Sequence, residues 1–164
     1  DVGVYYQGEG EVGTGLIRPM VRVEFANTRE NGLGMPLPMG AVKVYQRDRS
    51  GSVQMLGEDR ISHTPRDEKL SLFVGRSFDV VAERRRTNFR RISQRQTEQS
   101  FEIELRNRKD TPERVTVLER HFGDWQITTS SIPGRKLDAN TQEFVVDLKP
   151  GETVKITYTV ETRW

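Results

Sequence analysis

The chain of 164 residues contains no cysteine. This absence excludes disulfide frameworks, thiolate metal sites and cysteine nucleophiles. It leaves the cellular compartment open, because a domain of this length can fold in an oxidising space without a disulfide. Long apolar runs are also absent, and none approaches the roughly 18 residues that a membrane helix needs. Asp1 opens directly into a glycine-rich segment without a signal peptide, so we expect the chain to be part of a longer protein.

An excess of charge of one sign is missing as well. The 26 basic and 24 acidic residues leave a net charge of +2. Nucleic-acid-binding proteins usually carry a larger basic excess or a clustered basic face, so no nucleic-acid partner is predicted. The apolar fraction of 34% and the charged fraction of 30% fit strands that keep one face in water.

Helical periodicity with caps at both ends is absent too. Apolar residues instead alternate over short segments, with a turn signal every eight to twelve residues or so, which is typical of a sandwich or barrel. The clearest example is residues 101–106, followed by a polar turn over 107–112 and a second strand at 115–118. Other strands are predicted at residues 2–7, 21–25, 41–46, 53–56, 60–64, 70–74, 78–91, 144–148 and 154–160.

Two loops invite a functional interpretation. Residues 8–15 contain G-x-G-x-x-G, but Pro19 prevents the helix that a dinucleotide site requires, so a flexible loop is expected. Residues 31–40 hold two prolines, three glycines and four apolar side chains, those of Leu33, Met35, Leu37 and Met39. This segment either covers an open edge of the core or forms an exposed binding loop, and the first is favoured because exposed apolar patches are uncommon.

The stretch from Ser77 to Arg91 has apolar residues at alternate positions in its first half and is rich in arginine in its second half. Phe78, Val80 and Ala82 alternate as inward residues, and the same alternate positions continue as arginines. A bulge or a change of sheet is therefore predicted near residues 84–87. One hypothesis makes this stretch an anion-binding site. Its candidate residues are Arg84, Arg86, Arg90 and Arg91, with Arg85 and Arg95 nearby.

The alternative interpretation pairs the arginines with glutamates of the next strand. If a turn lies near residues 92–96 and opposed residue numbers sum to about 190, Arg86 faces Glu104 and Asn88 faces Glu102. Phe89 then shares a face with Phe101. Cross-strand charge pairs contribute a few tenths of a kcal/mol each and keep an outer face soluble. This interpretation makes the arginines part of the scaffold.

Several segments resemble the C-terminal part of the bacterial domain of unknown function 4139, a family that includes relatives of the mucoidy inhibitor proteins. The matching segments are residues 37–45, 61–65, 74–81, 102–110 and 148–152. The resemblance implies an exported protein, located in the periplasm or at the cell surface. It implies no reaction and offers no catalytic residue to transfer.

Few residues suggest chemistry. His63 and His121 each lack a second histidine at metal-ligand spacing, and no G-x-S-x-G elbow is present. The carboxylate pairs at 58–59 and 67–68 lie in polar, turn-like surroundings that would not raise a carboxyl pKa. Trp125 is expected to pack in the core. We therefore predict no catalytic residue, no metal and no cofactor.

The sequence predicts an all-β protein. Residues 69–164 are expected to form an immunoglobulin-like antiparallel β-sandwich, and residues 1–68 an additional N-terminal β portion or a second small sandwich. The predicted function is a non-catalytic structural or protein-interaction module, whose partner is another protein or the rest of a longer chain. The alternative is a module that binds polyanions or polysaccharides through the arginine-rich strand. A hydrolase is a third hypothesis, which requires catalytic residues that are distant in the sequence to come together in space.

Overall fold

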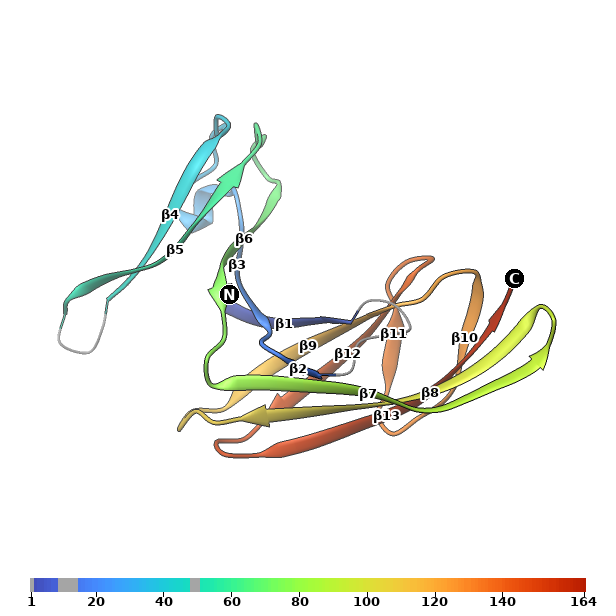
Figure 1. Ribbon diagram of the computed structural model, residues 1–164. Helices are drawn as coiled ribbons and strands as arrows, with labels where there is room; N and C mark the ends of the chain where they lie inside the picture. The colour runs from blue at the N-terminus through green and yellow to red at the C-terminus, as the bar shows by residue number, and fades with distance from the viewer. Residues whose placement is uncertain (1, 9–14, 48–50) are drawn as a thin grey trace. The chain divides into compact units, whose positions relative to one another are not determined.

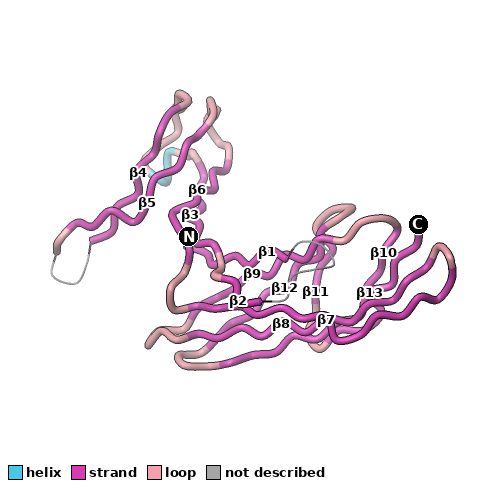
Figure 2. The backbone as a smooth tube through the Cα atoms, viewed as in Figure 1, coloured by secondary structure: helices cyan, strands magenta, loops and turns pink. Residues whose placement is uncertain are grey.

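The computed structural model describes residues 2–8, 15–47 and 51–164, and these residues form almost only strands (Figures 1 and 2). A 3-10 helix at Arg29–Asn31 is the one helical element among them. The strands are β1 (Val2–Gly8), β2 (Gly15–Ile17), β3 (Met20–Ala26), β4 (Gly40–Arg47), β5 (Val53–Ile61), β6 (Lys69–Arg76), β7 (Val80–Ser93), β8 (Gln96–Asn107), β9 (Glu113–Arg120), β10 (Asp124–Ser130), β11 (Gly134–Lys136), β12 (Thr141–Leu148) and β13 (Thr153–Arg163).

The chain divides into two compact units. The insert unit is Met20–Arg76 with the start of β1, and the sandwich unit comprises Val4–Pro19 and Ser77–Trp164. The sequence places the division after residue 68 instead. That point precedes β6, which pairs with β3 over its length and therefore stays with the insert unit.

Two sheets build the sandwich unit. The strands β11-β12-β9-β1 lie side by side in one sheet, and β10-β13-β8-β7-β2 form the other. Pairing within the second sheet is antiparallel, whereas β9 pairs antiparallel with β12 and parallel with β1. The predicted all-β, sandwich-like fold is confirmed, and its immunoglobulin-like topology stays a prediction.

The inner faces of the two sheets share one apolar core, because alternate residues of each strand point to the same side. Trp125, which the sequence places in the core, is 4% exposed. The other buried members are Val80, Ala82, Phe101, Ile103, Leu105, Val115, Val117, Phe144, Val146, Leu148, Ile156, Tyr158 and Val160. Phe78 does not belong to this group: it precedes β7 and is 78% exposed, so its predicted inward position is wrong.

Two turns carry the chain from one sheet to the other. The polar segment after β8 leads into β9 of the opposite sheet, and the Pro150-Gly151 turn connects β12 with β13 in the same way. Asn107, which is fully buried, joins these turns. Its side-chain amide donates to the carbonyl oxygens of Thr111 and Lys149 at 2.9 and 3.1 Å. Pro followed by Gly suits a tight turn, which in the sequence could join two strands of one sheet or cross to the other sheet. The structure shows the crossing.

The insert unit consists of two antiparallel pairs, β3–β6 and β4–β5. Leu70, Leu72 and Val74 of β6 are buried. β5 passes so close to β6 that a Cβ atom at Gly57 would lie 2.1 Å from the carbonyl oxygen of Val74. Only glycine permits that approach without a shift of the backbone.

Two predictions for the insert unit need correction. β5 continues to Ile61, so residues 60–64 do not form a separate strand, and Thr64 makes only an isolated bridge with Leu37. In the loop at residues 31–40, Leu33 and Leu37 are half-buried, but Met35 and Met39 are 61% and 63% exposed, so only part of the loop's apolar surface is covered. The residues between Gly8 and Gly15, with the G-x-G-x-x-G pattern, lie outside the described residues.

Candidate functional site

The β7–β8 hairpin carries all the arginines of the sequence hypothesis. A register shift between Arg86 and Asn88 confirms the predicted bulge. The predicted register is wrong, since Arg86 lies opposite Phe101 and Asn88 opposite Ser100. The reason is a tight turn between Ser93 and Gln96 with a second irregularity beside it, which moves the pairing by two to three residues.

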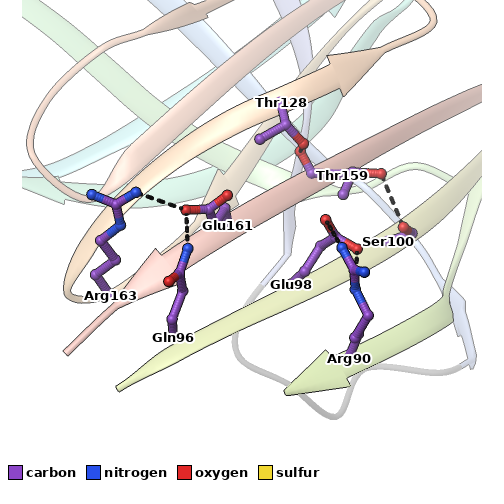
Figure 3. Close-up of polar contacts among 8 residues, drawn as sticks. All are labelled: Arg90, Gln96, Glu98, Ser100, Thr128, Thr159, Glu161 and Arg163. Carbon is purple, nitrogen blue, oxygen red and sulfur yellow. Dashed lines mark hydrogen bonds and ion pairs between the residues drawn. The ribbon is translucent and has the colours of Figure 1, made fainter. Parts of the chain in front are cut away.

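The bulge and the register divide the arginines between the two faces of the sheet. Arg85 and Arg90 lie on the outer face, where they form ion pairs with Glu102 at 2.7 Å and with Glu98 at 3.1 Å. Figure 3 shows the Arg90–Glu98 pair in a row of polar contacts that continues across β8, β13 and β10. These outer arginines follow the scaffold interpretation.

The inner face holds Arg84, Arg86 and Arg91. Arg86 contacts the amide oxygen of Gln99 at 3.3 Å and lies over the ring of Phe89 at 5.2 Å. Arg91 lies opposite Thr97 and donates to the carbonyl oxygen of Ser93. The four candidate residues, Arg84, Arg86, Arg90 and Arg91, are therefore not gathered on one surface.

Arg84 is buried inside the sandwich. Its Nε donates to Glu119 Oε2 at 2.9 Å, and the two side chains are 2% and 0% exposed. The hydroxyl of Tyr158 donates to the same oxygen, whereas Glu119 Oε1 has no hydrogen-bond partner among the described residues. The guanidinium group of Arg84 also lies 4.0 Å from the centre of the Phe101 ring. Burial of such a pair is costly, because both charges lose their hydration.

The same environment shifts three pKa values. Burial raises the pKa of Glu119, and the nearby charge of Arg84 acts against that rise. Burial, and then the charge of Arg84, lowers the pKa of His121 to about 4. Burial is also the main reason why the pKa of Tyr158 lies above its ordinary value. His121 is therefore neutral at pH 7.

One end of the core is polar on all four strands that surround it. Along β7 the inward residues change from Val80 and Ala82 to Arg84, and along β9 they change from Val115 and Val117 to Glu119, with His121 just after the strand. β8 and β13 continue in the same way to Gln99 and Thr162. We call Arg84, Gln99, Glu119, His121 and Thr162 the polar end of the core.

A small pocket opens at the polar end of the core. It has a volume of about 60 Å³. Its lining residues are Arg84, Gln99, Phe101, Arg120, His121, Phe122, Val160, Thr162 and Trp164. Phe122 and Trp164 are 55% and 65% exposed, and they flank the pocket with aromatic surface. His121 Nε2 is buried and has no partner among the described residues.

The pocket does not form a catalytic triad. A hydrolase would need a histidine bonded to both a carboxylate and a hydroxyl. Neither ring nitrogen of His121 makes such a bond among the described residues, and Glu119 is bonded to Arg84 and Tyr158 instead. His63 is exposed, and its Nδ1 accepts from the backbone N–H of Met39 at 3.3 Å. Within the described residues, no three His, Asp or Glu side chains could hold a metal ion.

Strands β10 and β11 form neighbouring edges of the two sheets (Figure 1). Residues of both strands line a larger cleft. We call it the β10–β11 cleft. It has a volume of about 710 Å³. The half-buried Ile127 and Ile132 supply apolar surface, whereas Trp125 and Phe144 border the cleft from the core and are 4% and 1% exposed. Threonine, serine and glutamine side chains of residues 126–131 and 142 supply its polar surface. Lys136 lies over the Trp125 ring, with its Nζ 4.1 Å from the ring centre.

Comparison with known proteins adds no relative. None of the family models, curated proteins or solved structures with which the chain was compared matches it. The resemblance to the domain of unknown function 4139 therefore stays a prediction. Among the described residues, no helix is long and apolar enough to cross a membrane.

The sequence hypothesis missed Glu119 as a site residue and gave His121 no partner. Both residues continue the alternation of Val115 and Val117, so their inward direction follows from the two-residue period. An acid and a histidine at inward positions are the signal that could have identified the polar end of the core. The β10–β11 cleft carries no comparable signal, because it depends on how the two sheets end.

Proposed function

We propose that this chain is a non-catalytic interaction module that binds an extended segment of a partner protein along the free edge of β10. The observation that carries the proposal is the β10–β11 cleft, which lies beside an edge strand. Among the described residues, β10 pairs with β13 on one side only. An edge strand offers unpaired N–H and C=O groups, and an added strand can satisfy them.

The scarcity of charge favours β10 over the other long edge. Natural edge strands are commonly protected by charged residues. Strand β10 begins with the exposed Asp124, and the segment from Trp125 to Gly134 after it contains no charged residue, although 30% of the chain is charged. The edge of β7 beyond its pairing with β2 instead carries Arg85, Arg90 and Arg91. Strand β10 therefore has one charge at its start, whereas β7 has several along its edge.

The cleft has a suitable size and surface for one extended segment. Its volume of about 710 Å³ lies within the range that binding sites usually have. An added strand would place alternate side chains toward the half-buried Ile127, and the others toward water. A register shift between Ile127 and Thr129 shortens the regular edge to the first residues of β10, from Asp124 to Ile127. We therefore expect a short segment with alternating apolar and uncharged polar residues.

A charge placed on β10 tests this function. Gln126 is exposed and lies opposite Glu161, so Gln126→Lys leaves the fold intact while it adds a protecting charge to the edge. Heptapeptides selected from a random display library on the wild-type chain serve as probes. We expect them to slow amide hydrogen exchange in β10 and to lose about tenfold or more in affinity for the variant.

Val145→Lys is the matched control, because Val145 is 48% exposed on β12, which lies between two other strands. This variant should bind the selected peptides as the wild type does. Peptides that leave the exchange of β10 unchanged, or that bind both variants equally, would contradict the proposal. A dimer that only Gln126→Lys dissociates would identify a second copy of the chain as the occupant, which also contradicts it.

The proposed location, in the periplasm or at the cell surface, rests on the family resemblance alone. Fractionation of cells that express the full-length protein tests this location. Recovery in the cytoplasmic fraction would contradict it.

A further inference from the structure

We propose that the pocket at the polar end of the core binds an acidic sugar, that is, a pyranose ring that carries a carboxylate group. This site is separate from the β10–β11 cleft, which is lined by a different set of residues. The inference goes beyond the proposed function and does not depend on it.

The first argument is that the buried charges and unpaired polar atoms at the polar end of the core lower the stability of the fold. Aliphatic side chains fill the inward positions at the other end of the same strands. Arg84 and Glu119 occupy equivalent positions as a buried ion pair, and Glu119 Oε1 and His121 Nε2 have no partner among the described residues. Unsatisfied buried polar atoms cost stability and occur preferentially where they have a function. Of Glu119 and His121, the latter lines the pocket, so a ligand that bonds to its imidazole gives a reason for a polar residue at this inward position.

The second argument is the combination of groups that line the pocket. Gln99, His121 and Thr162 offer an amide, a neutral imidazole and a hydroxyl within a volume of about 60 Å³. This volume is about that of two water molecules, so it admits one small polar group of a larger ligand. A hydroxyl or carboxylate substituent of a sugar ring has this size, and its neighbouring hydroxyls reach the other polar groups.

The third argument is the aromatic surface at the pocket mouth. Phe122 and Trp164 are more than half exposed, and the side chain of Trp164 passes close to Gly123, whose added Cβ would lie 3.3 Å from the indole. Aromatic faces beside convergent polar groups are typical of sites for ligands with one apolar and one polar surface. A pyranose ring has this character, because its C–H groups gather on one face.

The charge of the site favours an acidic sugar over a neutral one. Two of the lining residues, Arg84 and Arg120, are arginines, and none is acidic. Glu119 balances the charge of Arg84, and Arg120 lies at the exposed side, where its charge also acts on Asp138. Arg86 adds a further positive charge beside Gln99. A carboxylate on the ligand therefore meets a positive environment.

Titration with two oligosaccharides tests the proposal. The probes are tetragalacturonate and the neutral maltotetraose, which has the same number of rings. We expect saturable changes in the backbone amide NMR signals of residues 97–101 and 119–123 with tetragalacturonate. Maltotetraose should bind about tenfold or more weakly, because it lacks the carboxylate groups.

Three variants locate the binding. Trp164→Ala removes exposed aromatic surface, and Thr162→Val removes a buried hydroxyl while it keeps the shape of the side chain; each should raise the dissociation constant about tenfold. Phe78→Ala is the matched control, because Phe78 is also an exposed aromatic ring, with the Arg18 guanidinium 5.5 Å from its centre. It should leave the constant unchanged.

Several results would overturn the proposal. One is the absence of saturable NMR changes at millimolar tetragalacturonate, which would leave the polar end of the core as a hydrated structural feature. Another is equal affinity for both oligosaccharides. A third is binding that Arg90→Ala weakens as much as Trp164→Ala does, since Arg90 lies on the outer face and would report only general attraction to a polyanion.

Discussion

Arg84 and Glu119 form a charge pair that the sandwich core must enclose without water. Removing one member leaves the other charge buried and unpaired, and such changes cost about 3 to 5 kcal/mol. We expect Glu119→Ala to lower the free energy of unfolding by an amount in this range. Urea unfolding monitored by circular dichroism measures the effect.

The double variant Arg84→Met with Glu119→Leu distinguishes the contribution of the ion pair to stability from the contribution of side-chain packing at the same positions. Because both charges are removed, it should recover at least half of the stability that Glu119→Ala loses. The outer pair of Arg90 and Glu98 provides the comparison, since Arg90 is 63% exposed and Arg90→Ala should cost below about 1 kcal/mol. A double variant that is less stable than Glu119→Ala would show that the ion pair itself stabilises the fold.

His121 makes the stability depend on pH. Its pKa falls from 6.5 to about 4 in the folded chain, chiefly because the ring is buried. Below pH 6.5 the unfolded chain takes up a proton that the folded chain accepts only near pH 4. The contribution of neutral His121 is therefore fully present above pH 6.5 and is lost as the pH falls to about 4, by about 3 kcal/mol.

Urea unfolding at intervals between pH 7 and pH 4 measures this slope. His121→Gln should flatten it, because the variant lacks the group that titrates differently in the two states. Glu119 acts in the opposite direction, since its raised pKa favours the folded chain at low pH, and its contribution is common to the wild type and the variant. His63→Gln, at an exposed site, should keep the wild-type slope, and an unchanged slope in His121→Gln would contradict the assignment.

At the scale of single strands, the two-residue period predicted most elements. Residues 144–148 and 154–160 alternate clearly, and they lie within β12 and β13 as observed. The same period reveals the bulge near Arg86, where the inward residues change parity. Alternation succeeds because burial of one face is a local property of each strand.

The pairing between strands is harder to predict from the sequence. The register of β7 and β8 depends on the tight turn after Ser93 and on two irregularities, and an error of three residues moves Arg86 from the outer face to the inner face. The sheet to which a strand belongs is also not a local property. The sequence does not show whether the turns after Asn107 and Leu148 stay within one sheet, and both cross between the sheets.

Because register and sheet membership cannot be read from the sequence, the predicted arginine patch differs from the candidate site in the structure. The arginines are adjacent in sequence, and this suggested one patch, but the bulge and the register separate Arg90 from Arg84. The polar end of the core combines residues from four strands of two sheets. Its members come together only through the crossing connections, which the sequence does not specify.

The whole molecule has a nested chain path, in which the insert unit interrupts the sandwich unit between Pro19 and Ser77. The backbone N–H of Ser77 donates to the carbonyl oxygen of Pro19 at 2.8 Å, so the chain leaves and returns at the same place. The buried residues of the sandwich core come from residues 80–160. The sandwich unit therefore contains its own core and a closed path for its backbone.

This geometry predicts that the insert unit can be excised. Replacing Met20–Arg76 by two glycines spans the short gap between Pro19 and Ser77 at little entropic cost. We expect the shortened chain to unfold cooperatively in urea and to keep the near-ultraviolet circular dichroism of the buried Trp125 and Tyr158. A full-length chain with the same two glycines inserted after Pro19 controls for the linker. A shortened chain without a cooperative transition, beside a control that folds, would show that the sandwich unit requires the insert unit to fold.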